Sequence, residues 1–392
     1  MPESIVVVGA KRTPIGAMQG KFNSLAAHQL GAVAIRAALE QAGVGPAEVD
    51  DLIMGCVLPA GQGQAPARQA ALGAGLDKAT PCTTINKMCG SGMKAAMMAT
   101  DALLAGDGSV VVAGGMESMT NAPHLLPKAR AGYRYGHARV LDHMAFDGLE
   151  NAYDGKPMGF FADRTAEKYG ITREAMDAYA KESTSRAVNA SRSGAFAAEI
   201  APVTVAGRKG EEIVKDDETP FTVNVEKIST LRPAFNKDGL VTAATSSSIS
   251  DGAAALVLMS ESQAKKRGAK PLARIVAQAS NAHEPEWFTT APVGAIQKAL
   301  ARAGWKAADV DLYEVNEAFA VVTMAAMKEI GIAADKVNVN GGAVALGHPI
   351  GATGARIITT LIYALRKRGL KKGLAALCIG GGEATAVALE IL

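Results

Sequence analysis

Two distant segments of the chain share one pattern of apolar and polar positions. Within residues 30–43 and again within 292–304, apolar side chains recur every three or four positions, which is the spacing of the buried face of a helix. Each segment ends at a glycine, Gly43 or Gly304, and glycine readily takes the left-handed conformation that closes a helix. The two glycines lie 261 positions apart (304 − 43), and the apolar residues around them keep the same offset. The pattern therefore predicts two related helices.

A longer motif repeats in the same way. A turn rich in glycine, a helix of small residues and an apolar strand that ends in glycines run from Cys89 to Glu117, and again from His348 to Glu383. A run of β-branched residues at 5–8 predicts a further strand near the start of the chain. Strands that alternate with helices are typical of layered folds with mixed sheets. We therefore expect an α/β protein with α/β/α layers, built from two pseudo-symmetric halves.

The middle of the chain does not follow this repeat. We expect residues 1–118 to form the N-terminal half, which residues 250–270 complete, and residues 271–392 to form the C-terminal half. Residues 119–249 would then be an inserted loop domain.

The insert allows two interpretations. It holds most of the tyrosines, a charged stretch at 208–219 and a helical pattern that starts near Thr172. It could be a surface insertion whose charges are solvated. It could also be a subdomain that holds a ligand, since insertions above the crevice of an α/β fold often do so.

Composition and charge exclude several classes of protein. The 392 residues are 48% hydrophobic and 20% charged, with a net charge of +3, which gives no basic surface of the kind that nucleic acid requires. The longest apolar stretches stay below the ~18 residues of a membrane span, and the start of the chain lacks the basic lead of a signal peptide. The four cysteines form no C-x-x-C pair. We expect a reduced, cytoplasmic protein that binds neither membranes nor nucleic acid.

Cys89 is the first candidate for chemistry. It stands where the strand-like segment 82–88 meets the helix that opens at Gly90. Free N–H groups and the helix dipole at such a position stabilise a thiolate. The alternative is an inert buried thiol, which is the usual state of a free cysteine.

His348 occupies the mirror position in the second half, so the repeat would bring the starts of the two helices together. A thiolate needs a partner that takes its proton, and histidine is the usual one. A histidine that caps its helix is the alternative. Cys378 ends an apolar run, which by itself indicates a core cysteine, and Asn316 could either orient a water or close a loop.

Taken together, these segments resemble the thiolase family, and within it the acetoacetyl-CoA thiolases. The length, the repeat and the insert agree with the family as well. The matching segments lie in the family's order along nearly the whole chain: Asn86-Lys-Met-Cys-Gly-Ser-Gly-Met-Lys-Ala, Gly114-Gly-Met-Glu-Ser-Met, Asn316-Glu-Ala-Phe-Ala, Gly341-Gly-Ala-Val-Ala-Leu-Gly-His-Pro-Ile-Gly-Ala and Cys378-Ile-Gly-Gly-Gly.

The resemblance implies a reversible condensation of two acetyl-CoA molecules to acetoacetyl-CoA and coenzyme A. Cys89 would carry the acyl group as a thioester, and His348 would take its proton. Asn316 would hold a water in one oxyanion hole, and the N–H groups of Cys89 and Gly380 would form the other. Cys378 would move the α-proton of the second acyl-CoA. This scheme combines covalent catalysis, a base and oxyanion stabilisation, and it requires no metal or bound cofactor.

The resemblance also assigns the insert to coenzyme A and suggests a homotetramer. Ser247 and Phe235 would touch the pantetheine, and Leu149 and Met158 would line the acyl pocket. Short-chain members commonly have histidine where this chain has Pro157, and their Asn-Ala-Ser-Gly-Leu-Asn-Asp turn is Thr-Ser-Ser-Ser-Ile-Ser-Asp here. No residue for the 3′-phosphate of coenzyme A stands out in the sequence.

Four other functions compete with this one. A longer-chain 3-ketoacyl-CoA thiolase would share the chemistry with a different pocket. A ketosynthase would share the fold, but such enzymes generally pair one cysteine with two histidines, or with a histidine and an asparagine, whereas Cys378 supplies a second thiol. A silent CoA-binding subunit would not need Cys89, His348 and Cys378. A zinc site would need ligands in close pairs, and these are scattered.

Overall fold

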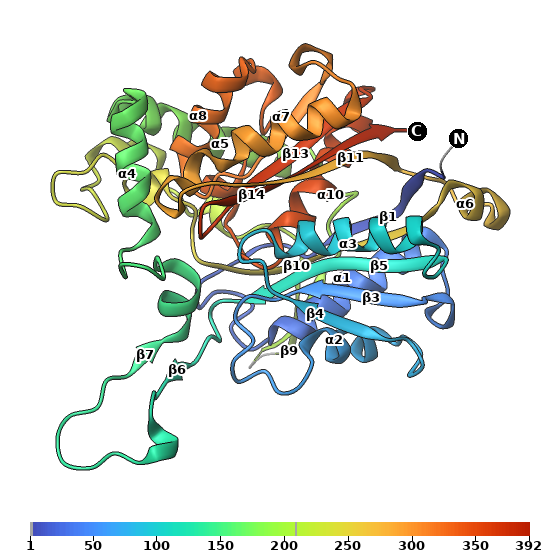
Figure 1. Ribbon diagram of the computed structural model, residues 1–392, viewed down its shortest axis with the longest axis horizontal. Coiled ribbons are helices and arrows are strands. Elements are labelled where there is room, and N and C mark those ends of the chain that lie inside the picture. Colours follow the sequence, from blue (N-terminus) through green and yellow to red (C-terminus); the bar gives the residue numbers. More distant parts are fainter. Residues whose placement is uncertain (1–2, 208–209) are drawn as a thin grey trace.

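The strands of the first half form one side of the molecule (Figure 1). The fold is described from a computed structural model, which covers residues 3–207 and 210–392. Strands β3 and β4 are parallel, as are β3 and β5, whereas β10 runs antiparallel to both of its neighbours β5 and β1. The strands stand in the order β4-β3-β5-β10-β1, with bounds Cys82–Ile85, Asp51–Gly55, Val110–Ser118, Ser250–Ser260 and Ile5–Arg12.

The second half repeats this order and these directions. Strand β12 is parallel to β13, and β14 is antiparallel to both β13 and β11. A short antiparallel pairing of β1 with β11 joins the two sheets edge to edge. The expected repeat is therefore confirmed, since β12-β13-β14-β11 matches β3-β5-β10-β1; the bounds are Leu312–Val315, Lys372–Ile379, Glu383–Ile391 and Ala273–Ala282.

Helices separate and cover the two sheets, so that five layers alternate (Figure 1). Helices α1 (Ala27–Ala42) and α2 (Pro66–Ala74) cover the outer face of the first sheet. Helices α3 (Ser91–Ala105) and α10 (Thr353–Arg368) lie between the sheets. Helix α7 (Ala291–Ala303) covers the outer face of the second sheet, and α8 (Ala320–Ile330) packs beside it. As predicted, α1 and α7 end at Gly43 and Gly304, both in the left-handed conformation.

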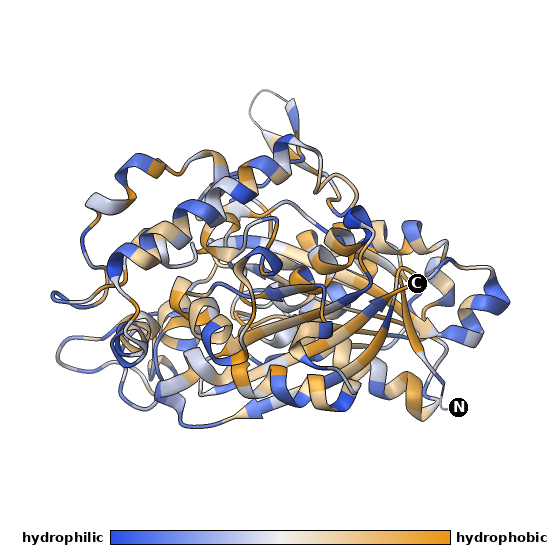
Figure 2. Cartoon of the chain, turned by 90° about the horizontal axis from the view of Figure 1, so that it is seen from above, coloured by the Kyte–Doolittle hydropathy of each residue, from blue (hydrophilic) through white to orange (hydrophobic). Residues whose placement is uncertain are grey.

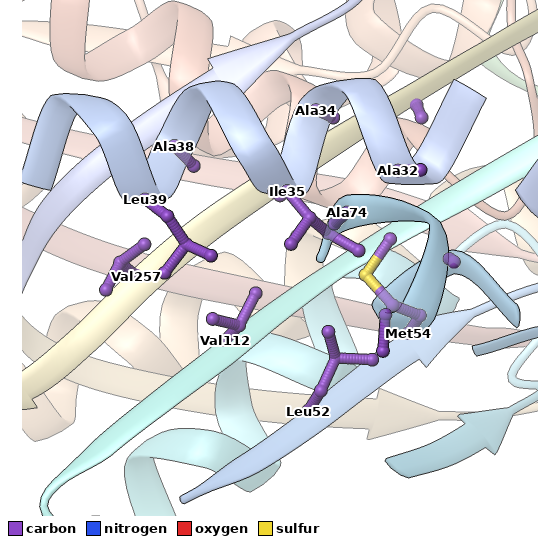
Figure 3. Packing of buried hydrophobic residues seen from close by; sticks show 14 of the residues in the cluster. Ala32, Ala34, Ile35, Ala38, Leu39, Leu52, Met54, Ala74, Val112 and Val257 are labelled. Carbon is purple, nitrogen blue, oxygen red and sulfur yellow. The ribbon is translucent and has the colours of Figure 1, made fainter. Parts of the chain in front are cut away.

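The side chains on the two faces of each strand pack against different helical layers, because successive side chains point to opposite sides of a sheet. Figure 3 shows Ile35 and Leu39 of α1 directed at Val112 of β5 and Val257 of β10. The alternate residues of the same strands face α3 and α10 instead. The cartoon coloured by hydropathy shows the same division, with apolar strands inside and mixed helices around them (Figure 2).

The middle helices approach each other through glycine. A Cβ on Gly92 of α3 would lie 2.9 Å from the backbone nitrogen of Ala355 in α10, and one on Gly354 would lie 2.2 Å from that of Met93. No side chain fits between the two backbones at these positions. The starts of α3 and α10 therefore lie against each other, as the repeat predicted.

The insert is partly tied into the core rather than lying on the surface. The charged stretch 208–219 was open to interpretation as solvated, and this is wrong for Asp217, which is buried against Arg12 of β1 (Nη1–Oδ1 2.7 Å, Nη2–Oδ2 2.9 Å). The same guanidinium donates to the buried Glu199. Arg208 and Lys209 of this stretch lie outside the described residues.

Two helices and two small hairpins make up much of the insert. Helix α5 begins directly after Thr172, as the sequence predicted, and the hydroxyl of Thr172 caps it by accepting the N–H of Ala175. The hairpin of β6 and β7 forms the base of an arm that projects from the body in Figure 1. The bounds are His124–Leu125 (β6), Leu141–Asp142 (β7), Met158–Tyr169 (α4), Arg173–Arg192 (α5), Val203–Gly207 (β8) and Gly210–Val214 (β9).

Four shorter elements complete the strands, the α-helices and the π-helix of the described residues; 3₁₀ turns make up the rest of the helical segments. Strand β2 pairs with the start of β10, α6 follows β10, and α9 precedes His348; a one-turn π-helix lies just before α4. The bounds are Gly16–Ala17 (β2), Glu261–Arg267 (α6), Ala343–Leu346 (α9) and Ala145–Leu149 (π-helix). Among the helices of residues 3–207 and 210–392, none combines the length and the apolar character needed to cross a bilayer.

Candidate active site

A cavity of about 510 Å³ opens where the two halves and the insert meet. Cys89 and His348 enter it from the starts of the two middle helices, and Cys378 and Gly380 enter from the end of β13. Four of the five residues predicted to act in catalysis therefore share one wall. The fifth, Asn316, lies directly behind His348.

The turn that carries Cys89 is shaped by its neighbours. Met88 takes a left-handed conformation (φ 47°), which is uncommon for a residue with a side chain. The hydroxyl of Ser91 accepts the N–H of Lys87 and donates to the carbonyl of Met88, which closes the turn. A Cβ on Gly90 would lie 2.3 Å from Cδ1 of Ile379, so the turn is pressed against the end of β13. The thiol is thereby fixed between the two halves.

Burial raises the pKa of the Cys89 thiol to about 11. The backbone N–H groups of Gly380 and of Cys89 itself lower the pKa, while the carboxylate of Glu117 raises it further. The expectation that the helix start would favour a thiolate is therefore wrong for the resting protein, because the cost of desolvating a charged sulfur exceeds the gain from the N–H groups. The resting nucleophile is a neutral thiol.

His348 is oriented by a single hydroxyl. Its Nδ1 lies 2.7 Å from Oγ1 of Thr353, and that hydroxyl donates its own proton to the carbonyl of Pro349 (2.9 Å). The hydroxyl must therefore accept from Nδ1–H, which leaves Nε2 unprotonated and able to accept a hydrogen bond. Burial lowers the pKa of His348 to about 3, and the positive charge of Arg356 lowers it further. The resting imidazole is therefore neutral, and its unprotonated Nε2 can receive a proton during reaction.

Asn316 follows β12 and is buried behind the imidazole. Its Nδ2 lies 3.4 Å from Nε2 of His348, and its Oδ1 is buried without a hydrogen-bond partner among the described residues. A buried amide oxygen of this kind is normally satisfied by a water or a ligand. The amide is therefore placed to hold a small polar group beside His348.

Cys378 is buried in an apolar cluster at the inner end of the cavity. Desolvation raises its pKa well above the usual range of a thiol, and the nearby Cys89 adds to this effect. Gly380 follows two residues later, with Met158 of the insert above it: a Cβ at Gly380 would lie 3.6 Å from Cε of Met158. Two thiols of raised pKa, those of Cys89 and Cys378, therefore line the cavity.

All four residues predicted to contact the substrate line the cavity. Leu149 and Met158 come from the π-helix and α4, and Phe235 and Ser247 come from the later part of the insert. Ser247 is fixed from both its N–H and its hydroxyl, which each donate to the carbonyl of Ala318 (3.0 Å). Of the two interpretations of the insert, these contacts favour the one in which it holds a ligand.

The sequence did not single out several residues of the cavity. Phe319 and Phe288 pack edge to face (ring centroids 6.4 Å apart), and Phe319 packs in the same way on Phe235. Phe319 lies in the recognised segment 316–320 and could have been found there, whereas nothing in the sequence marks Phe288. Glu117 lies in the segment 114–119, and it is buried near Cys89.

Within residues 3–207 and 210–392, no three side chains of His, Cys, Asp or Glu gather closely enough to hold a metal ion. Cys89, His348 and Cys378 bring two thiols and a neutral imidazole to the cavity. The cavity above them is mostly apolar, with serine hydroxyls at one side.

Comparison with known families places this cavity in context. Residues 5–262 match the family described as Thiolase, N-terminal domain, and residues 269–391 match Thiolase, C-terminal domain. The chain belongs to the thiolase family. In this thiolase the boundary between the two matched domains lies between β10, which belongs to the first sheet, and β11, which belongs to the second.

Related proteins cover this thiolase from end to end. It is 51% identical to an acetyl-CoA acetyltransferase 2 from Arabidopsis thaliana over 394 aligned residues, which cover 100% of this chain and 98% of the relative. It is 49% identical to an acetyl-CoA acetyltransferase from Chromobacterium violaceum, covering 98% and 99% of the two chains.

A solved structure has the same fold. The crystal structure of the Acat5 thiolase from Ascaris suum, in complex with coenzyme A, superposes with a TM-score of 0.94 at 40% sequence identity, and each chain is covered completely. The α/β architecture expected from the sequence is therefore the thiolase fold.

Proposed function

We propose that this thiolase is an acetyl-CoA acetyltransferase, which condenses two acetyl-CoA molecules to acetoacetyl-CoA and coenzyme A and also catalyses the reverse cleavage. The observation that carries the proposal is that Cys89, His348 and Cys378 all line a single cavity. Relatives about half identical over their full length bear the name acetyl-CoA acetyltransferase, which supports it. Coenzyme A thioesters are then substrates, and no bound cofactor takes part.

The first step is acyl transfer. The sulfur of Cys89 attacks the thioester carbonyl while its proton passes to Nε2 of His348, so that the neutral thiol does not have to ionise before the attack. The N–H groups of Cys89 and Gly380 donate to the carbonyl oxygen as it becomes negative. His348 then returns the proton to the departing sulfur of coenzyme A, and the acetyl group remains on Cys89.

The second step forms the carbon–carbon bond. Cys378 gives its proton to His348 and then takes the α-proton of a second acetyl-CoA, whose oxygen is held by His348 and by the water of Asn316. The carbanion attacks the acetyl group on Cys89, and the released sulfur recovers the proton from His348. The high pKa of Cys378 makes its thiolate a strong base for this proton.

The pocket favours a short acyl chain. Leu149, Met158 and Phe235 stand close to the two thiols, and Gly159 is so near Phe235 that its Cβ would lie 2.2 Å from the ring. Leu149 packs in one apolar cluster with Cys89, and Met158 and Phe235 pack in another with Cys378, so these side chains would crowd a long acyl tail. The runner-up is a thiolase with a broader chain-length range, because Pro157 in the cavity lining replaces the histidine of typical short-chain members. Rates of thiolytic cleavage with 3-ketoacyl-CoA of four, six and eight carbons separate the two, and acetoacetyl-CoA should have the highest kcat/KM.

Three broader properties follow from family resemblance. We infer a cytoplasmic enzyme that acts in fatty acid metabolism and assembles as a homotetramer. The projecting arm supports assembly, since it exposes Leu126, Tyr133, Tyr135 and Val140. We also infer the division of the chain. Residues 1–118 form the N-terminal half together with residues 250–270, because β10 completes the first sheet. Residues 119–249 form the insert, and residues 271–392 form the C-terminal half.

Two variants test the mechanism by separating its steps. Cys378→Ala should keep much of the exchange of acetyl groups between acetyl-CoA and labelled coenzyme A, because acyl transfer needs no carbon acid. Its condensation rate should fall by at least about 10²–10⁴-fold, the usual contribution of a general base. Cys89→Ala should lose both reactions. A folded Cys378→Ala protein that condenses within about tenfold of the parent would remove Cys378 from the mechanism.

A further inference from the structure

A buried carboxylate that takes no part in the proposed chemistry lies beneath the cavity. Glu117 is near the end of β5, has no exposed surface and gathers backbone donors from two separate loops. Its Oε2 accepts the N–H groups of Val57 (3.0 Å) and Gly351 (2.8 Å), and its Oε1 accepts that of Leu58 (3.0 Å). The thiol of Cys56 completes the set at 3.6 Å.

These donors belong to the two halves of the molecule. Cys56 to Leu58 follow β3, whereas Gly351 lies three residues after His348, just before α10 begins. Backbone N–H groups at a helix start have no partner within the helix, and an anion placed there is favoured by the helix dipole as well. One carboxylate therefore accepts hydrogen bonds from both halves, at the turn that connects His348 to α10.

The fit around Gly351 leaves no room for adjustment. A Cβ there would lie 2.6 Å from Oε2 of Glu117 and 2.9 Å from the carbonyl of Met116. Ile350, the residue before it, lines the cavity and packs with Val57 and Leu58 in one apolar cluster, against which Cys89 also packs. A change at the carboxylate is thus transmitted to the cavity floor at Ile350, one residue from Gly351, and to His348, three residues from it.

We propose that Glu117 is a positioning residue of the active site, whose carboxylate holds the turn between His348 and α10 against the loop that follows β3. The role requires two acceptor oxygens and therefore an ionised group. A protonated carboxyl would have to direct its O–H toward N–H donors, so at least one of these donors would lose its acceptor.

The ionisation of Glu117 falls within the working range of the enzyme. Burial raises its pKa to about 7, although the N–H groups of Val57, Leu58 and Gly351 oppose the rise. The titratable groups that face it are the thiols of Cys56 and Cys89, and its charge raises the pKa of both. Below pH 7 the carboxyl is increasingly protonated, the turn loosens, and the turnover rate should fall.

Glu117→Gln tests the proposal, because the amide has the size of the carboxyl but only one acceptor oxygen. At pH 8 its kcat for cleavage of acetoacetyl-CoA should fall about 10- to 100-fold, as expected when a buried donor beside a reacting group loses its acceptor. The KM should change less than about threefold, since Glu117 does not touch the substrate. The parent should lose activity as the pH falls through about 7, and the variant should show no such dependence.

Asp251→Asn is the matched control. Asp251 is also buried and lies on the neighbouring strand β10, but it holds the N–H of Thr120 instead of the turn before α10. Its kcat and pH profile should follow those of the parent. A Glu117→Gln protein with at least half of the parent's kcat would overturn the proposal, and so would a parent whose kcat is constant from pH 6 to pH 8.

The proposal rests on the proposed function, and one measurement separates the two. Hydrogen–deuterium exchange of the peptide that carries Gly351 needs no substrate. Protection at residues 350–353 should fall in Glu117→Gln and persist in Asp251→Asn; equal protection in both would overturn the role of Glu117 even if the parent proved inactive. An inactive parent with the expected exchange would instead refute the function alone.

Discussion

At the scale of single residues, burial decides the state of the reactive groups. The thiol of Cys89 and the imidazole of His348 are both neutral at rest, because desolvation in the site disfavours the charged form of each. Reactivity therefore comes from proton transfer during attack and not from a stored thiolate. This differs from thiol enzymes in which a cysteine and a histidine form a resting ion pair.

This state predicts how Cys89 responds to pH. The pKa of its thiol is raised to about 11, so the thiolate fraction, and with it the rate of alkylation by iodoacetamide, should rise about tenfold per pH unit from pH 7 to pH 10. Mass spectrometry of Cys89 after brief exposure at each pH measures the rate. Acetylation by acetyl-CoA at neutral pH, where His348 takes the proton, should remain fast. An alkylation rate that is already constant at pH 7 would contradict this account.

Sequence patterns identified the residues of the site but not their electrostatics. Cys89 and His348 were identified because each precedes a helix at corresponding points of the repeat, and Cys378 and Asn316 because the segments around them resemble a known family. These patterns could not predict the direction of the pKa shift at Cys89. That shift depends on the surroundings of the sulfur, which include segments far away in the sequence, among them residues 148–159 and 243–249. The role of Glu117 was hidden for the same reason, since its partners lie about 60 and 234 positions away.

At the scale of elements, the packing of α3 on α10 fixes the distance between the two reactive helix starts. The sequence predicted both helices and, through the repeat, their mutual contact. Glycine at position 92 indicated that another backbone could approach there, and the structure confirms it, but nothing in the sequence marked Gly354 as the facing glycine. The shared middle layer was therefore predictable, and its spacing was not.

Replacement of one glycine tests this spacing. Gly92→Ala places a Cβ 2.9 Å from the nitrogen of Ala355, so the helices must separate at a cost of about 1–3 kcal/mol, typical of overpacking. We expect a melting temperature several degrees lower and a loss of acetyl exchange, because Cys89 and His348 move apart.

Gly73→Ala on α2 is the control. The new Cβ meets Cβ of Ala32 at 3.1 Å, at a distance from the cavity, and alanine favours a helix. Its stability should stay within about 1 kcal/mol of the parent, with normal exchange. Equal behaviour of the two variants would show that the α3–α10 contact does not set the site geometry.

At the scale of the whole molecule, the arm based on β6 and β7 projects from the body of the chain. Its apolar residues Leu126, Tyr135 and Val140 are exposed far from the core. Large exposed apolar patches mark contacts with other molecules. The inferred homotetramer gives these side chains a place to be buried.

Light scattering after size-exclusion chromatography checks this inference. The parent should elute with the mass of four chains, and a variant with Leu126, Tyr135 and Val140 all changed to Ser should elute as a smaller species. Ile213→Ser, which changes an exposed apolar residue on β9, should leave the mass unchanged. A monomeric parent, or a triple variant that remains tetrameric, would remove the arm from the assembly.

The position of β10 has a consequence for how the protein is made. This strand lies between β1 and β5, yet residues 250–260 are synthesised long after both of them. While the ribosome translates the intervening insert, β1 and β5 each present an unpaired apolar edge, and such edges readily join with those of other chains. The N-terminal half therefore cannot close during the synthesis of its own first 118 residues. Newly made chains should depend on protection by chaperones until the strand that completes this sheet leaves the exit tunnel.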